Sequence, residues 1–163
     1  MRRLNFSGGE QVEDMLSKII EKAQAVGTLK VGFLEGSTYP DGQGVAEVAA
    51  YNEFGTQNMP ARPFFRSMIA EKSGNWGKSL GNIAKATNYD VARTLALMGE
   101  GIGSQLQQSI VKYNAVPLAD STVARKGFAK QLIDTATMVN SVGYEVNDGE
   151  KHILPSAAQG GGK

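Results

Sequence analysis

Apolar residues recur at three- and four-residue spacing in two long stretches of the chain. In residues 10–25 they are Val12, Met15, Leu16, Ile19, Ile20 and Ala23. In residues 89–112 they are Val91, Leu95, Met98, Ile102, Leu106 and Ile110. This spacing places apolar side chains along one side of an α-helix. Both stretches are therefore predicted to be amphipathic helices whose apolar stripes pack on other elements.

Three short segments have the features of strands. Residues 28–35 and 141–146 alternate apolar and polar positions, with the period of two that a strand with one buried face shows. Asn147, Asp148 and Gly149 then form a typical hairpin turn, and residues 151–154 are predicted to be the return strand. A further strand from the N-terminal region or from residues 36–44 is left open.

Two prolines and a glycine interrupt the chain between the first predicted strand and the long central helix. Residues 45–54 have a helical pattern that stops at Gly55. Pro60 and Pro63 fix two φ angles and exclude a helix before Phe64, where a helical pattern resumes. Residues 75–112 are predicted to be mostly helical, with a break near residues 87 and 88.

The combined pattern predicts a single α+β domain over residues 1–154. Its small, mainly antiparallel sheet is expected to pack against the long N-terminal helix and the long central helix. A length of 163 residues suits one domain. Residues 155–163, PSAAQGGGK, have no core-forming side chain and are predicted to be a flexible tail or one held by a partner.

Composition narrows the class of protein. The hydrophobic share of 41% and the charged share of 20% are typical of a globular protein. The chain has no cysteine, which excludes disulfides and thiolate chemistry. A net charge of +1 provides no general attraction to nucleic acid. No apolar run is long enough for a membrane span, so a soluble protein without membrane contact is expected.

The sequence offers little for catalysis. It contains a single histidine, His152, which is interpreted as an ordinary strand side chain, and it lacks the motifs GxSxG, HExxH and Walker A. Glu47 and Glu53 form a conceivable carboxylate pair, supported by helix spacing alone. We therefore predict that the chain is not an enzyme, with no catalytic residue, no cofactor and no metal site.

A small basic cluster provides an alternative function. Arg125, Lys126 and Lys130 lie close together in the sequence and form a possible DNA-facing surface of a nucleic-acid-binding module. Phosphate binding usually recruits about six or more cations, so a solvated basic face is favoured over a binding site.

Residues 45–66, VAEVAAYNEFGTQNMPARPFFR, resemble the signature of a tailed-bacteriophage family. This family comprises tail-completion or neck (head–tail joining) proteins, including minor tail protein Z-like and virion morphogenesis proteins. The matching motifs are Glu53-Phe54-Gly55 and Pro60-Ala61-Arg62-Pro63-Phe64. Two further blocks resemble the family: residues 117–127 and residues 132–146, although Ala136 stands where the family usually has glycine.

The resemblance implies a structural virion protein that forms a homo-oligomeric ring, most simply a hexamer, in the virion neck. Such a ring connects the portal and adaptor side to the tail terminator or tube and lets genomic DNA pass through its lumen. It is assembled in the host cytoplasm. The residues expected at the subunit or partner contact are Glu53, Phe54, Pro60, Arg62, Phe64 and Arg66.

The proline-framed segment also has a physical interpretation of its own. Pro60 and Pro63 stiffen the chain, so Arg62 is presented with little conformational entropy left to lose. Glu53 is a candidate partner for its guanidinium, within one subunit or across two. Whether this corner joins two helices of one chain or forms the subunit contact stays open at the level of sequence.

Overall fold

The computed structural model describes residues 9–23, 27–114, 136–147, 149 and 151–155. The elements are α1 (Gly9–Ala23), β1 (Leu29–Phe33), α2 (Val45–Phe54), α3 (Phe64–Lys72), the short 3-10 helix η1 (Ser73–Asn75), α4 (Trp76–Ala86), α5 (Val91–Asn114), β2 (Val142–Val146) and β3 (Lys151–Ile153). A helical segment at residues 136–140 precedes β2. The predicted α+β class is confirmed.

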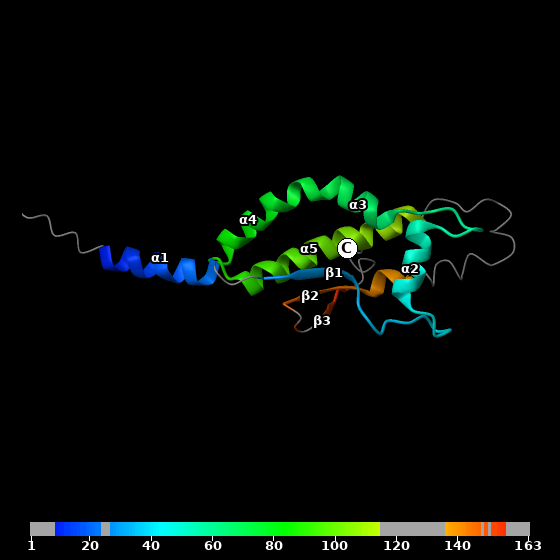
Figure 1. The fold of residues 1–163 in the computed structure, drawn as a ribbon, viewed down its shortest axis with the longest axis horizontal. Coiled ribbons are helices and arrows are strands. Elements are labelled where there is room, and N and C mark those ends of the chain that lie inside the picture. Colours follow the sequence, from blue (N-terminus) through cyan, green and yellow to red (C-terminus); the bar gives the residue numbers. More distant parts are fainter. Residues whose placement is uncertain (1–8, 24–26, 115–135, 148, 150, 156–163) are drawn as a thin grey trace, which may run out of the picture.

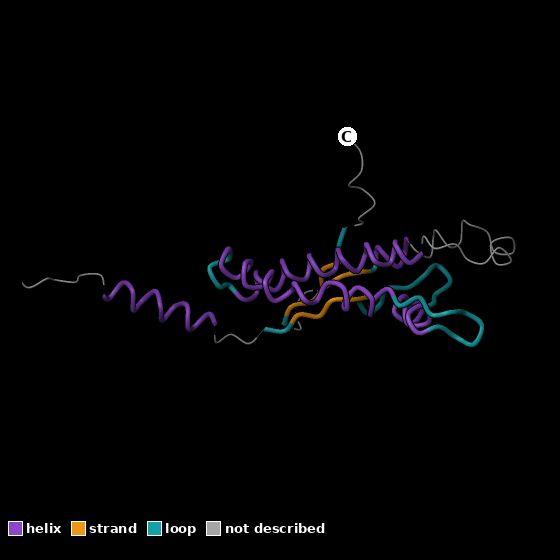
Figure 2. Tube along the Cα trace, turned by 90° about the horizontal axis from the view of Figure 1, so that it is seen from above, coloured by secondary structure: helices purple, strands orange, loops and turns teal. Residues whose placement is uncertain are grey.

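Helix α5 is the centre of the fold (Figure 1). One side of it packs against β1 and β2, and another side packs against α3 and α4. The view from above also shows α5 lying along the sheet (Figure 2). The predicted stripe on α5 is confirmed, since Met98, Leu106 and Ile110 are buried and contribute to the core.

The three strands form an antiparallel sheet in the order β1-β2-β3. Val31 lies opposite Tyr144, and Phe33 lies opposite Val142. Val142 and Tyr144 are buried and belong to the core under α5, as the period of two requires. Residues 36–44 add no strand to this sheet and contain only an isolated bridge between Thr38 and Gly44.

The break between α4 and α5 falls where the sequence predicts it. Asn88 and Tyr89 have φ angles of 51° and 60°, in the left-handed region that ends a helix. Asp90 then starts α5, since its Oδ1 accepts a hydrogen bond of 3.0 Å from the Arg93 backbone N–H. The turn therefore reverses the chain and lets α4 pack along α5.

Helix α1 departs from the prediction that the N-terminal helix packs on the sheet. The structure describes it over Gly9–Ala23, and residues 24 and 25 of the predicted range lie outside the described residues. It extends away from the body in both views (Figure 1, Figure 2). Its apolar side chains Val12, Met15, Leu16 and Ile20 are exposed. An apolar stripe indicates that burial is favourable but does not specify the surface that provides it. None of the described helices is long and apolar enough to cross a membrane.

Two glycines of α5 differ sharply in their surroundings. A Cβ added to Gly99 would lie 2.6 Å from Cγ of the buried Tyr144 ring, whereas one added to Gly101 would meet no atom within 4 Å. Gly99 therefore permits the close approach of α5 to β2. Gly101 has no such packing role.

This difference gives a matched pair of substitutions. Gly99→Ala is expected to lower the free energy of unfolding by about 1–3 kcal/mol, because the ring has to move within a packed core. Gly101→Ala is expected to raise it by up to about 1 kcal/mol, since alanine is the better helix former. Urea denaturation of both variants measures the difference. Equal effects would contradict the close packing of α5 on β2.

Candidate functional site

The segment singled out in the sequence forms a corner between α2 and α3. Helix α2 ends at Gly55, whose φ and ψ angles are 77° and 174°. A Cβ at this position would lie 2.8 Å from the Ala61 backbone nitrogen. The Arg62 N–H donates a hydrogen bond of 2.6 Å to the Asn52 carbonyl oxygen. The loop therefore folds back tightly on the end of α2, which only glycine at position 55 permits.

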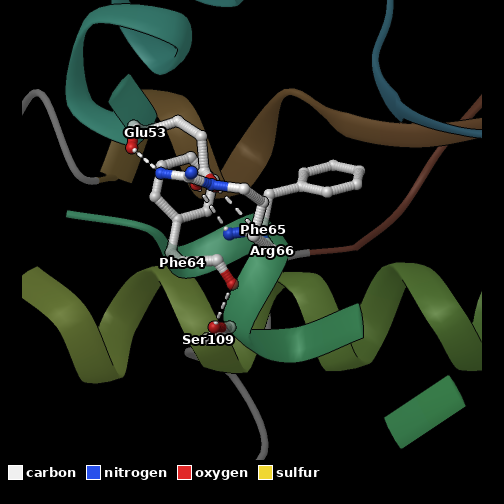
Figure 3. Close-up of polar contacts among 5 residues, drawn as sticks. All are labelled: Glu53, Phe64, Phe65, Arg66 and Ser109. Atoms are coloured by element: carbon white, nitrogen blue, oxygen red, sulfur yellow. Dashed lines mark hydrogen bonds and ion pairs between the residues drawn. The ribbon is translucent and has the colours of Figure 1, made fainter. Parts of the chain in front are cut away.

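The buried carboxylate of Glu53 holds the start of α3 (Figure 3). Its oxygens accept hydrogen bonds from the backbone N–H groups of Phe65, at 2.9 Å, and Arg66, at 3.1 Å. These donors lie in the first turn of α3, where backbone N–H groups lack partners within the helix and the helix dipole favours a negative charge. Glu53 thus caps a helix that begins eleven residues later in the chain.

Arg66 closes the corner from the solvent side. Its Nε donates to Glu53 Oε1 at 2.8 Å, and its terminal nitrogen donates to the Glu53 carbonyl oxygen at 2.9 Å (Figure 3). The guanidinium carbon lies 5.0 Å from the centre of the Phe54 ring, within the range of a cation–π interaction. The Phe54 side chain is nevertheless 68% exposed. A fixed arginine and an exposed aromatic ring therefore stand side by side.

The inner side of the corner is anchored in the core. Phe64 is buried and meets the Phe33 ring edge to face, with a centroid distance of 6.3 Å. The Ser109 hydroxyl donates a hydrogen bond of 2.7 Å to the Phe64 carbonyl oxygen, which ties α3 to α5 (Figure 3). The corner is therefore fixed to the sheet and to the central helix.

The six residues predicted at the contact divide into two groups. Phe54, Pro60 and Arg66 are exposed and can meet a partner, whereas Glu53 and Phe64 are buried within the chain and Arg62 is half-buried. Glu53 was a candidate partner for Arg62, within one subunit or across two, but within this chain the structure pairs Glu53 with Arg66. Among the described residues, the Arg62 side chain forms no ion pair.

Tyr51 belongs to the same exposed surface and was not predicted from the sequence. It lies one helical turn before Phe54 and is 43% exposed. Its hydroxyl donates a hydrogen bond of 2.6 Å to Glu47 Oε1. This hydrogen bond, together with the negative charge of Glu47, raises the pKa of the Tyr51 hydroxyl because both favour its protonated form. The sequence could have indicated this surface, because Tyr51 and Phe54 are three residues apart in a predicted helix and such residues lie on the same side.

The other residues considered for catalysis or binding do not form a common site among the described residues. Glu53 is paired with Arg66, whereas Glu47 is exposed and paired with Tyr51, so the two carboxylates do not share a site. The His152 ring stacks on Tyr144 at a centroid distance of 5.0 Å, as an ordinary strand side chain can. The described residues contain no group of three or more potential metal ligands. Arg125, Lys126 and Lys130 lie outside the residues that the structure describes.

Comparisons of the chain with protein-family models, with curated proteins and with solved structures give no match.

Proposed function

We propose that this chain is a structural subunit that assembles with copies of itself into a ring at the head–tail joint of a tailed bacteriophage. The family-like residues 45–66 support this function. They form one braced corner rather than a flexible loop, and a preorganised surface loses little entropy on binding. The ring, proposed as a hexamer, joins the portal and adaptor side to the tail terminator or tube in the virion neck.

The observation that carries the proposal is the exposed pair of Phe54 and Arg66 on this corner. Phe54 is 68% exposed. The carboxylate of Glu53 holds the guanidinium of Arg66 over the Phe54 ring. Aromatic residues and arginine are over-represented among the residues that dominate binding energy at protein interfaces. Tyr51, also exposed, extends the same surface by one helical turn. We call Tyr51, Phe54 and Arg66 the corner surface.

A closed ring imposes a requirement on its subunit. Each copy must carry two different, mutually complementary surfaces, because cyclic assembly joins the front of one subunit to the back of the next. The corner surface provides one of them. It lies at the opposite end of the molecule from α1, so the chain presents contact groups at both ends (Figure 1).

Phe54→Ala is expected to weaken self-association by more than about tenfold, which corresponds to about 1.4 kcal/mol of lost contact energy. The fold should be nearly unaffected, because an exposed cation–π contact contributes only about 0.5–1 kcal/mol. Mass photometry over a concentration series measures the association of the folded variant.

Ile153→Ala is the matched control for this experiment. Ile153 is 62% exposed, nearly as much as Phe54, but it lies on β3 rather than on the corner. The control is expected to associate like the unmodified chain. If Phe54→Ala and Ile153→Ala behave alike, the corner surface is not a subunit contact.

A further inference from the structure

Helix α1 carries an apolar stripe that the described residues of its own chain leave exposed. Its members, each more than half exposed, are Val12, Met15, Leu16 and Ile20. With about 100° of rotation per residue, all four lie on one side of the helix. The helix extends away from the sheet and from α5 (Figure 1, Figure 2). A helix of 15 residues is marginal in water unless its apolar side is packed, so α1 is expected to have a partner.

Helix α5 has an exposed stripe beside the surfaces that pack on the sheet and on α3 and α4. We call it the outer stripe, and its members are Leu97, Gly101, Ser104, Gln108 and Val111. Steps of four, three, four and three residues keep them within about 80° of one another around the helix. Leu97 and Val111 are apolar and lie at the ends of the stripe. Its centre lacks bulk, since a Cβ added to Gly101 would meet no atom within 4 Å.

The α1 stripe and the outer stripe are complementary in length and shape. Helix α1 has 15 residues, and the outer stripe runs over an equal stretch of α5, so both are about 22 Å long. The α1 stripe consists of large apolar side chains, whereas the centre of the outer stripe is small. Large side chains can therefore lie over Gly101 and Ser104 while the helix axes approach to about 8–10 Å.

Charges at the edges of the two stripes favour an antiparallel arrangement. Glu13 lies at one edge of the α1 stripe, about 85° from its centre, and forms no ion pair among the described residues. Lys112 and Glu100 lie on opposite edges of the outer stripe, each about 60° from its centre. An antiparallel helix places Glu13 on the Lys112 edge, whereas a parallel helix places it on the Glu100 edge, where like charges repel. The side chain of Lys112 is 74% exposed and its ion pair with Glu71 is long, at 4.0 Å, so it can reach Glu13.

The connection of α1 to the body favours a second copy over the chain's own α5. Gly27 is packed against Val91 and Leu95, since a Cβ added to Gly27 would lie 2.7 Å from Cγ1 of Val91 and would also contact Leu95. Val91 and Leu95 lie about 140° around α5 from the outer stripe. Ala23 is four residues before Gly27 and therefore at most about 14 Å from it. A path around α5 to its outer stripe is about 20 Å long at the usual spacing of packed helices.

We infer that α1 of one copy docks antiparallel along the outer stripe of α5 in a second copy. This inference rests on the proposed self-assembly and names a pair of surfaces that joins one subunit to the next. Each copy gives its α1 to one neighbour and its outer stripe to the other. The contact is therefore heterologous, as a ring requires.

Gly101→Gln tests the outer stripe without disturbing the chain that carries it. The new side chain starts where no atom lies within 4 Å, and glutamine is a better helix former than glycine. The variant is expected to resist urea at least as well as the unmodified chain but to associate at least about tenfold more weakly. Gly81→Gln is the matched control, because Gly81 is also exposed and without neighbours within 4 Å but lies on α4. Mass photometry over a concentration series is expected to show normal association of the control.

Mixing two variants tests whether the contact joins two copies. Leu16→Gln/Ile20→Gln removes the apolar side chains of α1 and retains good helix formers. Alone, this variant is expected to associate at least about tenfold more weakly than the unmodified chain. An equimolar mixture with Gly101→Gln is expected to associate more strongly than either variant alone. The intact α1 of the Gly101→Gln chain then meets the intact outer stripe of the other chain, and native mass spectrometry identifies the mixed oligomers by mass.

The possible outcomes separate this inference from the proposed function. If both variants assemble as well as the unmodified chain, the inference is wrong while the proposed self-assembly stands. If Gly81→Gln weakens association as much as Gly101→Gln, the outer stripe is not the contact. If the mixture associates no better than its components, docking on a second copy is wrong, as it would be if α1 folded back on its own chain. If the unmodified chain remains monomeric, both proposals fail.

Discussion

Glu53→Ala is expected to lower the free energy of unfolding by about 3 kcal/mol. The carboxylate accepts hydrogen bonds from two backbone N–H groups and from the Arg66 guanidinium. Losing a helix cap costs about 0.5–2 kcal/mol, and each backbone donor left without an acceptor costs about 1–3 kcal/mol unless water reaches it. The midpoint of thermal unfolding should fall by about 10 °C for a chain of this size.

Two further variants separate the roles of Glu53. Arg66→Met removes the ion pair, the hydrogen bond to the Glu53 carbonyl oxygen and the contact with the Phe54 ring, but it leaves the hydrogen bonds of Glu53 to the backbone of α3. The arginine side chain is 57% exposed, so the substitution should cost only about 1 kcal/mol. Glu53→Gln retains an acceptor for α3 but loses the charge, and an intermediate cost is expected. Thermal unfolding followed by circular dichroism measures all three. If Glu53→Ala is no worse than Arg66→Met, then capping of α3 is not the main contribution of Glu53.

Gly55→Ala is expected to destabilise the chain by at least about 3 kcal/mol. The φ and ψ angles of 77° and 174° lie in a region that only glycine populates readily, and a non-glycine residue there costs about 1–3 kcal/mol. The added Cβ would also lie 2.9 Å from the Met59 carbonyl oxygen, a backbone atom that cannot rotate away. The loop would have to open, and the Arg62 N–H would lose its short hydrogen bond to Asn52.

Gly42→Ala is the matched control for the steric part of this effect. Gly42 has a φ of 85°, but an added Cβ there would meet no atom within 4 Å. Its cost should be that of the backbone conformation alone, about 1–2 kcal/mol. Urea denaturation compares the two variants. Equal losses for Gly42→Ala and Gly55→Ala would contradict the tight return of the loop on α2.

Much of the fold follows from local patterns in the sequence. The stripe on α5, the alternation of β1 and β2 and the stop at Gly55 each reflect a rule that acts within a few residues. The position of α1 does not follow from such a rule. Its stripe is as regular as that of α5, yet Met15 is 66% exposed whereas Ile110 is fully buried. The stripes alone do not distinguish a core helix from one that extends away from the body.

The sequence located the candidate site but did not identify which arginine pairs with Glu53. The motif places Glu53 before the corner and two arginines after it, and both arginines are chemically suitable partners. The choice between them depends on where α3 begins. Because α3 starts at Phe64, Arg66 lies in its first turn beside the Glu53 carboxylate, while the Arg62 N–H binds the end of α2. The partner of Glu53 therefore depends on tertiary structure, which the local sequence pattern does not specify.

Assembly of the chain with itself into a closed ring can be tested by measuring the mass of the assembled protein. Native mass spectrometry of the full-length chain, over a range of concentrations, is predicted to show one dominant closed oligomer, a hexamer in our proposal. Negative-stain images of the same sample are predicted to show rings with an open centre. A chain that stays monomeric at every concentration, or that adds subunits without closing, would show that it does not form such a ring.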